Sequence, residues 1–157
     1  MHVIASMSDD NKKTAPCSPA SATKLWVTLA HTQQRVLAAM ERDLKAAGLP
    51  PLSWYDVLWE LDRAEDGRLR PFEIEERTLL TQYNLSRLID RLEKEALVRR
   101  EVFDRDCRGR WVVITEAGRE RRARMWTIYR RSIDDHLGAR LSEVEAQMLT
   151  GLLRRLA

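Results

Sequence analysis

The sequence predicts a mainly α-helical fold with one small β-hairpin, and three observations support this prediction. Apolar residues recur at i, i+3, i+4 and i+7 in the longer segments, the spacing of helices that pack by one face. The short runs VRREVF and RWVVI enclose the polar loop DRDCRG, an arrangement typical of a hairpin. A segment with a strongly polar helical face directly precedes that hairpin. A polar helix followed by a basic hairpin predicts a winged helix-turn-helix.

The N-terminal residues 1–23 are expected to form a flexible tail, because they are polar, interrupted by prolines and without periodicity. Thr23 is the expected N-cap of a first helix over residues 24–47. Gly48 and the two prolines after it end that helix. At 157 residues the chain has the length of one domain, so residues 24–157 are predicted to fold as one unit.

A second helix is expected over residues 53–64, with Asp56 three residues after Ser53 in a capping-box arrangement. Residues 66–67 form a turn, and residues 68–70 are predicted to pair as a short strand with the hairpin. A third helix over residues 71–79 begins with proline, which the first turn of a helix tolerates.

Thr81 is the expected N-cap of the fourth helix, whose apolar stripe is Leu85, Leu88, Ile89 and Leu92. After the hairpin, Thr115 caps a long fifth helix to His136. Leu141-Ser142 opens a last helix with a dense apolar stripe. The predicted winged helix-turn-helix lobe therefore covers residues 53–115, flanked by helical segments over residues 24–47 and 116–157.

Charge is concentrated where the polar helix and the hairpin lie. Between Arg77 and Arg131 there are 15 Lys and Arg against 8 Asp and Glu, whereas the net charge of the whole chain is only +3. A basic segment of this kind suits a polyanion, and solvated helix surface is the alternative explanation.

Three stretches together resemble one known family. They are SWYDVLWEL, TQYNLSRLIDRLEKEALVRRE and DRDCRGRWVVITEAG, and the resemblance runs from about Leu25 to the C-terminus. They resemble the multiple antibiotic resistance regulator (MarR) family of bacterial transcription factors. The resemblance implies a homodimer that binds pseudo-palindromic double-stranded DNA, usually as a repressor, and that is often released by a small phenolic or aromatic acid.

The first, fifth and sixth helices carry more apolar side chains than closing the DNA-binding lobe requires. The resemblance assigns this excess to dimerisation, and the alternative is a single-chain helical bundle. The residues expected at the dimer interface are Leu25, Leu29, Val144, Met148, Leu149, Leu152, Leu153 and Leu156.

Side chains early in a recognition helix reach base edges, and arginine, asparagine and glutamine can pair with bases in the major groove. The candidates for DNA contact on this helix are Gln82, Tyr83, Asn84, Ser86, Arg87 and Arg91. Arg91 has an alternative role, an ion pair with Glu95. In the hairpin, Asp106 and Arg108 match the family's D-x-R, with Arg105 and Arg110 expected at phosphates. Freely solvated hairpin arginines are the alternative.

Three residues depart from the family pattern. Ala96 stands at the corner after the recognition helix, where the family usually has glycine. Phe72 replaces a common capping residue in the third helix. Glu75 replaces a small residue that lets the two helices cross closely. These residues put the detailed helix-turn-helix geometry in question.

No enzyme motif, metal-ligand spacing or phosphate-binding glycine loop is present, so no catalytic role, metal or cofactor is expected. The chain has no apolar run of membrane-spanning length and no secretory signal pattern. Its two cysteines make no disulfide framework, and a cytoplasmic protein without a membrane partner is expected. Cys107 lies beside Arg108, which would favour oxidation; an incidental cysteine is the alternative, and Cys17 lies in the predicted tail.

An effector site between the lobe and the flanking helices is expected from the resemblance. Aromatic walls with one cation suit a flat aromatic acid, although aromatic residues at helical spacing also build cores. The candidates are Trp26, His31, Arg35, Trp54, Tyr55, Asp56, Met125 and Trp126. Two other functions stay open, a nucleic-acid binder without base specificity and a protein-interaction module on a degenerate winged helix.

Overall fold

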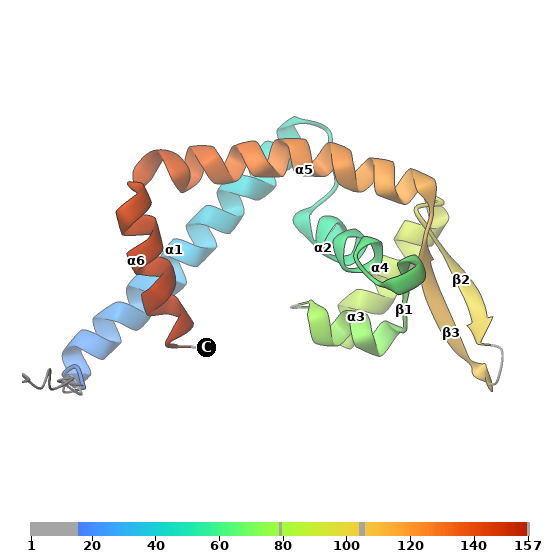
Figure 1. Cartoon of the computed structure of the whole chain (residues 1–157), viewed down its shortest axis with the longest axis horizontal. Coiled ribbons are helices and arrows are strands. Elements are labelled where there is room, and N and C mark those ends of the chain that lie inside the picture. Colours follow the sequence, from blue (N-terminus) through green and yellow to red (C-terminus); the bar gives the residue numbers. More distant parts are fainter. Residues whose placement is uncertain (1–15, 79, 104–105, 157) are drawn as a thin grey trace, which may run out of the picture. The chain divides into compact units, whose positions relative to one another are not determined.

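A computed structural model of the chain describes residues 16–78, 80–103 and 106–156; the side chains of residues 103–109 lie outside the described set. The chain divides into two compact units, residues 1–35 and residues 36–157. The first unit contains the N-terminal part of helix α1 (Pro19–Ala46). The second unit contains the end of α1 and every other element (Figure 1).

Helix α1 begins earlier than predicted. The Ser18 hydroxyl accepts a hydrogen bond from the Ser21 N–H at 3.3 Å, and Pro19 occupies the first turn, where its missing N–H costs nothing. Thr23 is therefore not an N-cap; its hydroxyl donates to the Pro19 carbonyl inside the helix. The prediction that residues 1–23 form a tail is wrong for residues 19–23. The helix ends at Ala46, one residue before the predicted end, and Gly48 just after it has a left-handed φ of 69°.

Helix α2 (Leu52–Asp62) begins after Pro51, and no side chain caps it. The predicted capping box of Ser53 and Asp56 does not form. The Leu52 N–H instead donates to Glu41 Oε1 of α1 at 3.0 Å, so a carboxylate from another helix satisfies one of the free N-terminal amides. After a 3-10 turn (Glu65–Gly67), β1 (Arg68–Leu69) is the short strand that was predicted.

Helix α3 (Pro71–Arg77) ends two residues before the prediction, and α4 (Gln82–Lys94) begins after Thr81, as expected. Strands β2 (Val98–Phe103) and β3 (Asp106–Ile114) form the hairpin. The sheet order is β1-β3-β2, antiparallel throughout, with Leu69 opposite Val112. The fold is mainly helical with a three-stranded wing sheet, which confirms the predicted class (Figure 1).

Helix α5 (Glu116–His136) starts at Thr115, whose side chain accepts from the Gly118 N–H, and α6 (Glu143–Arg154) starts with a capping box of Ser142 and Glu145. One core inside the second unit joins α1, α2, α4, β3 and α5. Its fully buried members include Leu44 of α1, Leu58 of α2, Leu92 of α4, Val112 of β3 and Met125 of α5.

The corner between α4 and β2 is tied to the start of α5. The Thr115 N–H donates to the Leu97 carbonyl at 3.0 Å, and the Thr115 hydroxyl lies 2.7 Å from the Ala96 carbonyl. A Cβ atom at Gly118 would lie 2.2 Å from the same Leu97 oxygen, so only glycine allows this approach. Ala96 has a φ of 55°, so alanine adopts the left-handed backbone that the family's glycine usually provides.

Ala96→Gly is expected to raise the free energy of unfolding by about 0.5–1 kcal/mol. Glycine removes a left-handed strain of about 1–2 kcal/mol, and its greater freedom in the unfolded chain offsets about 0.4–1 kcal/mol of this gain. Urea denaturation at one fixed protein concentration measures the difference.

The control is Ala123→Gly at an exposed position within α5, which is expected to lose about 1 kcal/mol because its backbone is helical. If both variants lose stability alike, the corner at Ala96 carries no strain.

Candidate nucleic-acid interface

Helix α4 presents a polar face because its apolar face is consumed by the core. Leu85, Leu88 and Ile89 are each 2% exposed, and Leu92 is fully buried. The predicted DNA-contacting residues of this helix are all exposed on the surface that remains; they are Gln82, Tyr83, Asn84, Ser86, Arg87 and Arg91. Burial of one stripe therefore fixes which residues α4 offers to a partner.

Helix α3 supports α4 through buried Ile74, as the first helix of a helix-turn-helix does. The two departures noted in the sequence have a local consequence. Phe72 and Glu75 border a cavity of about 200 Å³ between the two helices, with Gln82 and Ser86 on its other side. The helices therefore pack with a hollow at their N-terminal ends.

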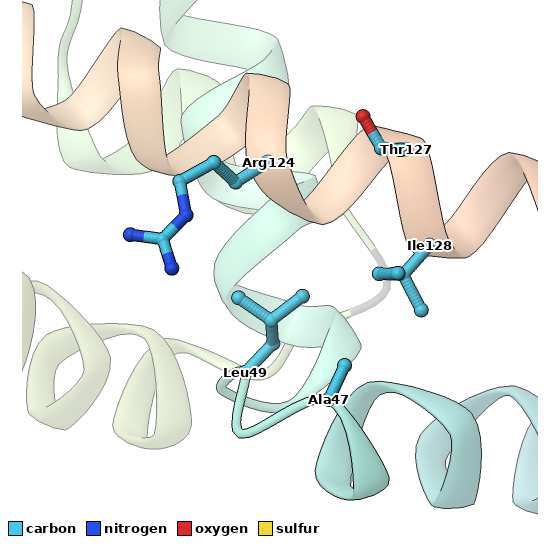
Figure 2. A pocket seen from close by; sticks show the side chains of 5 residues that line it. All are labelled: Ala47, Leu49, Arg124, Thr127 and Ile128. Carbon is cyan, nitrogen blue, oxygen red and sulfur yellow. The ribbon is translucent and has the colours of Figure 1, made fainter.

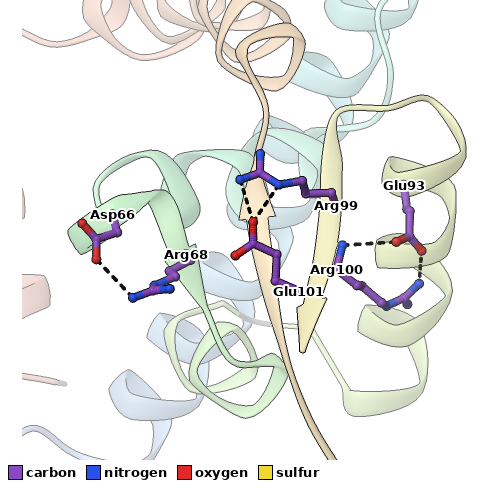
Figure 3. A network of polar contacts seen from close by, with 6 residues as sticks. All are labelled: Asp66, Arg68, Glu93, Arg99, Arg100 and Glu101. Carbon is purple, nitrogen blue, oxygen red and sulfur yellow. Dashed lines mark hydrogen bonds and ion pairs between the residues drawn. The ribbon is translucent and has the colours of Figure 1, made fainter. Parts of the chain in front are cut away.

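Arg100 of β2 forms ion pairs with two carboxylates of α4. Its side chain lies 2.5 Å from Asp90 and forms a second ion pair with Glu93, while its backbone N–H donates to Glu93 at 3.2 Å (Figure 3). Neither carboxylate is paired with an arginine of α4. Among the described residues, Arg87 and Arg91 consequently have no ion-pair partner.

The alternative role for Arg91, an ion pair with Glu95, is not formed. Glu95 pairs instead with Arg121 of α5 at 3.3 Å. The exposed guanidinium of Arg91 therefore has no ion pair among the described residues.

The wing exposes Arg110, which is opposite Val102 in the sheet. Asp106 and Arg108 lie in the backbone of β3, but their side chains lie outside the described set, as does that of Cys107. Arg105 lies outside the described residues altogether. The roles predicted for Asp106 and Arg108 therefore stay predictions from the sequence.

The outer face of the sheet holds a cluster that the sequence analysis missed. Trp111 has the guanidinium of Arg68 5.0 Å from its ring centroid and that of Arg70 at 5.1 Å. Arg68 also pairs with Asp66, and Arg99 pairs with Glu101 on the same face (Figure 3). The sequence contained one signal for this cluster. Side chains alternate between the two faces of a strand, so Arg68 and Arg70, which flank buried Leu69, share the outer face.

Three of the eight residues predicted to line an effector site are core, and Trp126 is 39% exposed. Trp54 and Tyr55 are each 6% exposed, and Met125 is fully buried. Tyr55 stacks on Trp126 with ring centroids 5.9 Å apart. Trp26, His31 and Arg35 are exposed on the first unit of the chain.

Asp56 is polar and half-buried beside this aromatic core. Burial raises the pKa of its carboxyl to about 6, and the nearby carboxylates of Glu41 and Glu60 act in the same direction. Among the described residues no hydrogen bond or ion pair to Asp56 offsets this burial, which therefore favours the protonated carboxyl.

A separate cavity of about 270 Å³ lies between α5 and the connection from α1 to α2. Leu49 and Ala47 border it on one side, and Arg124, Thr127 and Ile128 of α5 border it on the other (Figure 2). Its walls combine apolar side chains with one cation, although its residues are not those that the sequence singled out.

The residues predicted at a dimer interface are exposed in the single chain. Helix α6 buries none of its residues; Val144 is 68% exposed and Met148 63%. Leu149, Leu152, Leu153 and Leu156 are also exposed, as is Leu25 of the first unit, whereas Leu29 is half-buried.

The described ranges contain no group of three His, Cys, Asp or Glu side chains able to hold a metal ion. Within the same ranges, no helix is both long enough and apolar enough to span a bilayer. Cys17 is exposed.

Residues 47–109 of the chain match a model of the MarR family. The matched segment covers α2, β1, α3, α4, β2 and the beginning of β3. No curated protein matches the chain.

Solved structures share the fold over nearly the whole chain. Sco3205, a MarR family transcriptional regulator from Streptomyces coelicolor solved in complex with DNA, is 24% identical with a TM-score of 0.79, covering 92% of this chain and 90% of that one. AbsC, a MarR family transcriptional regulator from the same organism, is 26% identical with a TM-score of 0.76, covering 91% and 95%. BpsR from Bordetella bronchiseptica, whose DNA binding is regulated by 6-hydroxynicotinic acid, is 21% identical with a TM-score of 0.74, covering 85% and 98%.

Proposed function

We propose that this chain, which belongs to the MarR family of winged helix-turn-helix DNA-binding transcriptional regulators, is a homodimeric repressor of a pseudo-palindromic operator. The observation that carries the proposal is the exposed face of α4. Side chains able to form hydrogen bonds with base edges lie there beside Arg87 and Arg91. The nearby carboxylates of Asp90 and Glu95 are paired with arginines outside α4.

Base-specific binding is favoured over general affinity for nucleic acid by the composition of this face. Gln82, Asn84 and Arg87 each carry side-chain groups that match base edges in the major groove, whereas a purely electrostatic surface needs only cations. Arg91 and Arg110 are suited to phosphates, which position the protein without reading sequence. The solved complex of Sco3205 with DNA supports this use of the shared fold.

Arg87→Ala is expected to weaken operator binding by about 1–3 kcal/mol and to relax the preference at one base pair, because a bidentate contact to guanine is lost. Arg110→Ala is expected to weaken operator and random DNA alike and to lower the salt dependence by about one unit. Fluorescence anisotropy with the protein's own upstream region and a scrambled duplex measures both effects.

Arg130→Ala is the control, since it removes the same charge from an exposed position on α5. Equal losses on operator and random DNA for Arg87→Ala would contradict its assignment as a base-reading residue. A wild-type protein that does not distinguish the two duplexes would contradict the proposed function.

Dimerisation is proposed from the uncovered apolar face of α6. Four leucine and methionine side chains on a helix of 12 residues stay exposed in the single chain; they are Met148, Leu149, Leu152 and Leu153. Leu156, just after the helix, is exposed as well. A contiguous apolar surface of this kind marks an association site in a soluble protein. A two-fold dimer would also present two α4 helices to successive major grooves, about 34 Å apart.

Leu149→Asp combined with Leu152→Asp is expected to yield monomer or aggregate and to abolish operator binding, because two charges would be buried at the interface. Sedimentation velocity measures the assembly state. Gln147→Asp, at an exposed polar position on the same helix, is the control and should stay dimeric. A well-folded wild-type monomer at micromolar concentration would rule out the dimer.

A small aromatic acid is proposed as the effector, bound in the cavity between α5 and the connection from α1 to α2. The cavity volume of about 270 Å³ is just below the usual range for ligand sites, which begins at about 300 Å³, so it suits a single ring. Arg124 offers a cation for a carboxylate, and Leu49 and Ile128 offer apolar contacts (Figure 2). The regulation of BpsR by 6-hydroxynicotinic acid supports this class of ligand.

Benzoate-type acids such as salicylate are expected to raise the operator dissociation constant by about 5–150-fold, the usual range of allosteric coupling. Arg124→Gln is expected to blunt this shift while leaving operator affinity without ligand unchanged. Arg130→Gln serves as the charge-matched control. If a panel of such acids changes neither the melting temperature nor the operator dissociation constant, the effector proposal fails and the DNA-binding proposal stands.

A further inference from the structure

Tyr83 is the exposed aromatic residue of α4. Its side chain is 64% exposed, on the same face as the polar residues of this helix. An aromatic ring left at the surface gains nothing from the hydrophobic core.

The contact in the structure is with Arg87, one helical turn later. The guanidinium carbon of Arg87 lies 4.6 Å from the centroid of the Tyr83 ring. Side chains at i and i+4 are neighbours on a helix surface, and a cation over an aromatic face at this distance is attracted by the ring's quadrupole. The ring therefore holds the guanidinium while both groups remain exposed.

The way in which Arg87 is held matters for what it can still do. A carboxylate binds a guanidinium through its N–H edge and uses the donors that guanine would need. An aromatic ring contacts the flat face and leaves the N–H edge open. The acidic residue one helical turn after Arg87 is Asp90, and its carboxylate is paired with Arg100.

We propose that Tyr83 is a positioning residue, which holds Arg87 with its donor edge directed outward and so determines base specificity through Arg87 rather than through a base contact of its own. This inference rests on the proposed function. An arginine side chain that moves freely loses conformational entropy when it pairs with guanine, and a stacked one has less to lose.

The proposal makes the aromatic ring essential and the hydroxyl dispensable. Tyr83→Phe keeps the ring and is expected to bind operator within about twofold of wild type. Tyr83→Leu removes the ring and is expected to weaken operator binding by about two- to fivefold, from the usual strength of an exposed cation–π contact. Because Tyr83 is exposed, both variants should fold, and circular dichroism checks this.

The first test needs no DNA. With ¹⁵N-labelled arginine, the Nε–Hε resonance of Arg87 should show a ring-current shift in wild type and Tyr83→Phe and lose it in Tyr83→Leu. Absence of any difference between wild type and Tyr83→Leu would show that the two side chains are not in contact in solution, and the inference would be overturned.

The second test is a double-mutant cycle of Tyr83→Leu with Arg87→Ala on the operator. The expected result is that Tyr83→Leu has no further effect once Arg87 is alanine, and that it reduces discrimination at the same base pair as Arg87→Ala does. An equal loss in both backgrounds would mean that Tyr83 contacts DNA itself. A loss for Tyr83→Phe equal to that for Tyr83→Leu would mean that its hydroxyl does so.

Failure of the inference and failure of the proposed function give different results. If wild type shows no sequence preference, the proposed function fails, and the role of Tyr83 in specificity fails with it, even where the ring-current shift is present. If wild type is specific and the cycle shows no coupling, only the positioning role is lost.

Discussion

The carbonyl oxygen of Leu97 is the point on which the lobe depends. Leu97 lies three residues after the end of α4, and its carbonyl oxygen accepts a hydrogen bond from the Thr115 N–H at 3.0 Å and lies close to Gly118, which has no side chain. One oxygen thus joins the end of α4, the end of β3 and the start of α5. Ala96 must turn left-handed to place this oxygen, and the strain at one residue is accepted for a junction of three elements.

Ion pairs within the same lobe determine which of its arginines are neutralised. Arg100 and Arg121 take up the carboxylates on and next to α4, and Asp62 takes up Arg119 and Arg122 of α5. The arginines left without a carboxylate among the described residues include Arg87, Arg91 and Arg110. A chain whose net charge is only +3 thereby acquires a basic face, because tertiary contacts decide which charges cancel.

Periodicity was sufficient to predict the elements of the lobe and the buried stripe of α4, since both follow from local spacing. It failed where a distant residue decides the outcome. Ser53 and Asp56 had the spacing of a capping box, but Glu41 from α1 satisfies the start of α2 instead. Trp54 and Tyr55 were predicted to line a pocket, but they belong to the core. The sequence of one helix does not show how many aromatic side chains from other helices pack around it.

The exposed surface of α4 was predictable from the sequence, whereas its ion pairs were not. Exposure of Gln82 and Arg87 follows from the burial of the opposite stripe, which the sequence shows directly. The pairing of Arg100 with Asp90 and Glu93 depends on how β2 lies against α4, a matter of register that composition does not specify. Glu95 looked like the partner of Arg91 by helical spacing and pairs with Arg121 of another helix.

The anchoring of α5 also has a mechanical consequence. Its first turn is fastened to the lobe at Leu97 and, through Arg119 and Arg122, to Asp62 of α2. A helix of 21 residues is about 30 Å long, so a small rotation about its anchored first turns displaces its far end by a larger distance. A tilt of a few degrees at these turns moves the far end by an amount comparable to the diameter of an atom. Stiffness at one small junction therefore sets how faithfully a displacement at one end of α5 becomes a rotation of α4.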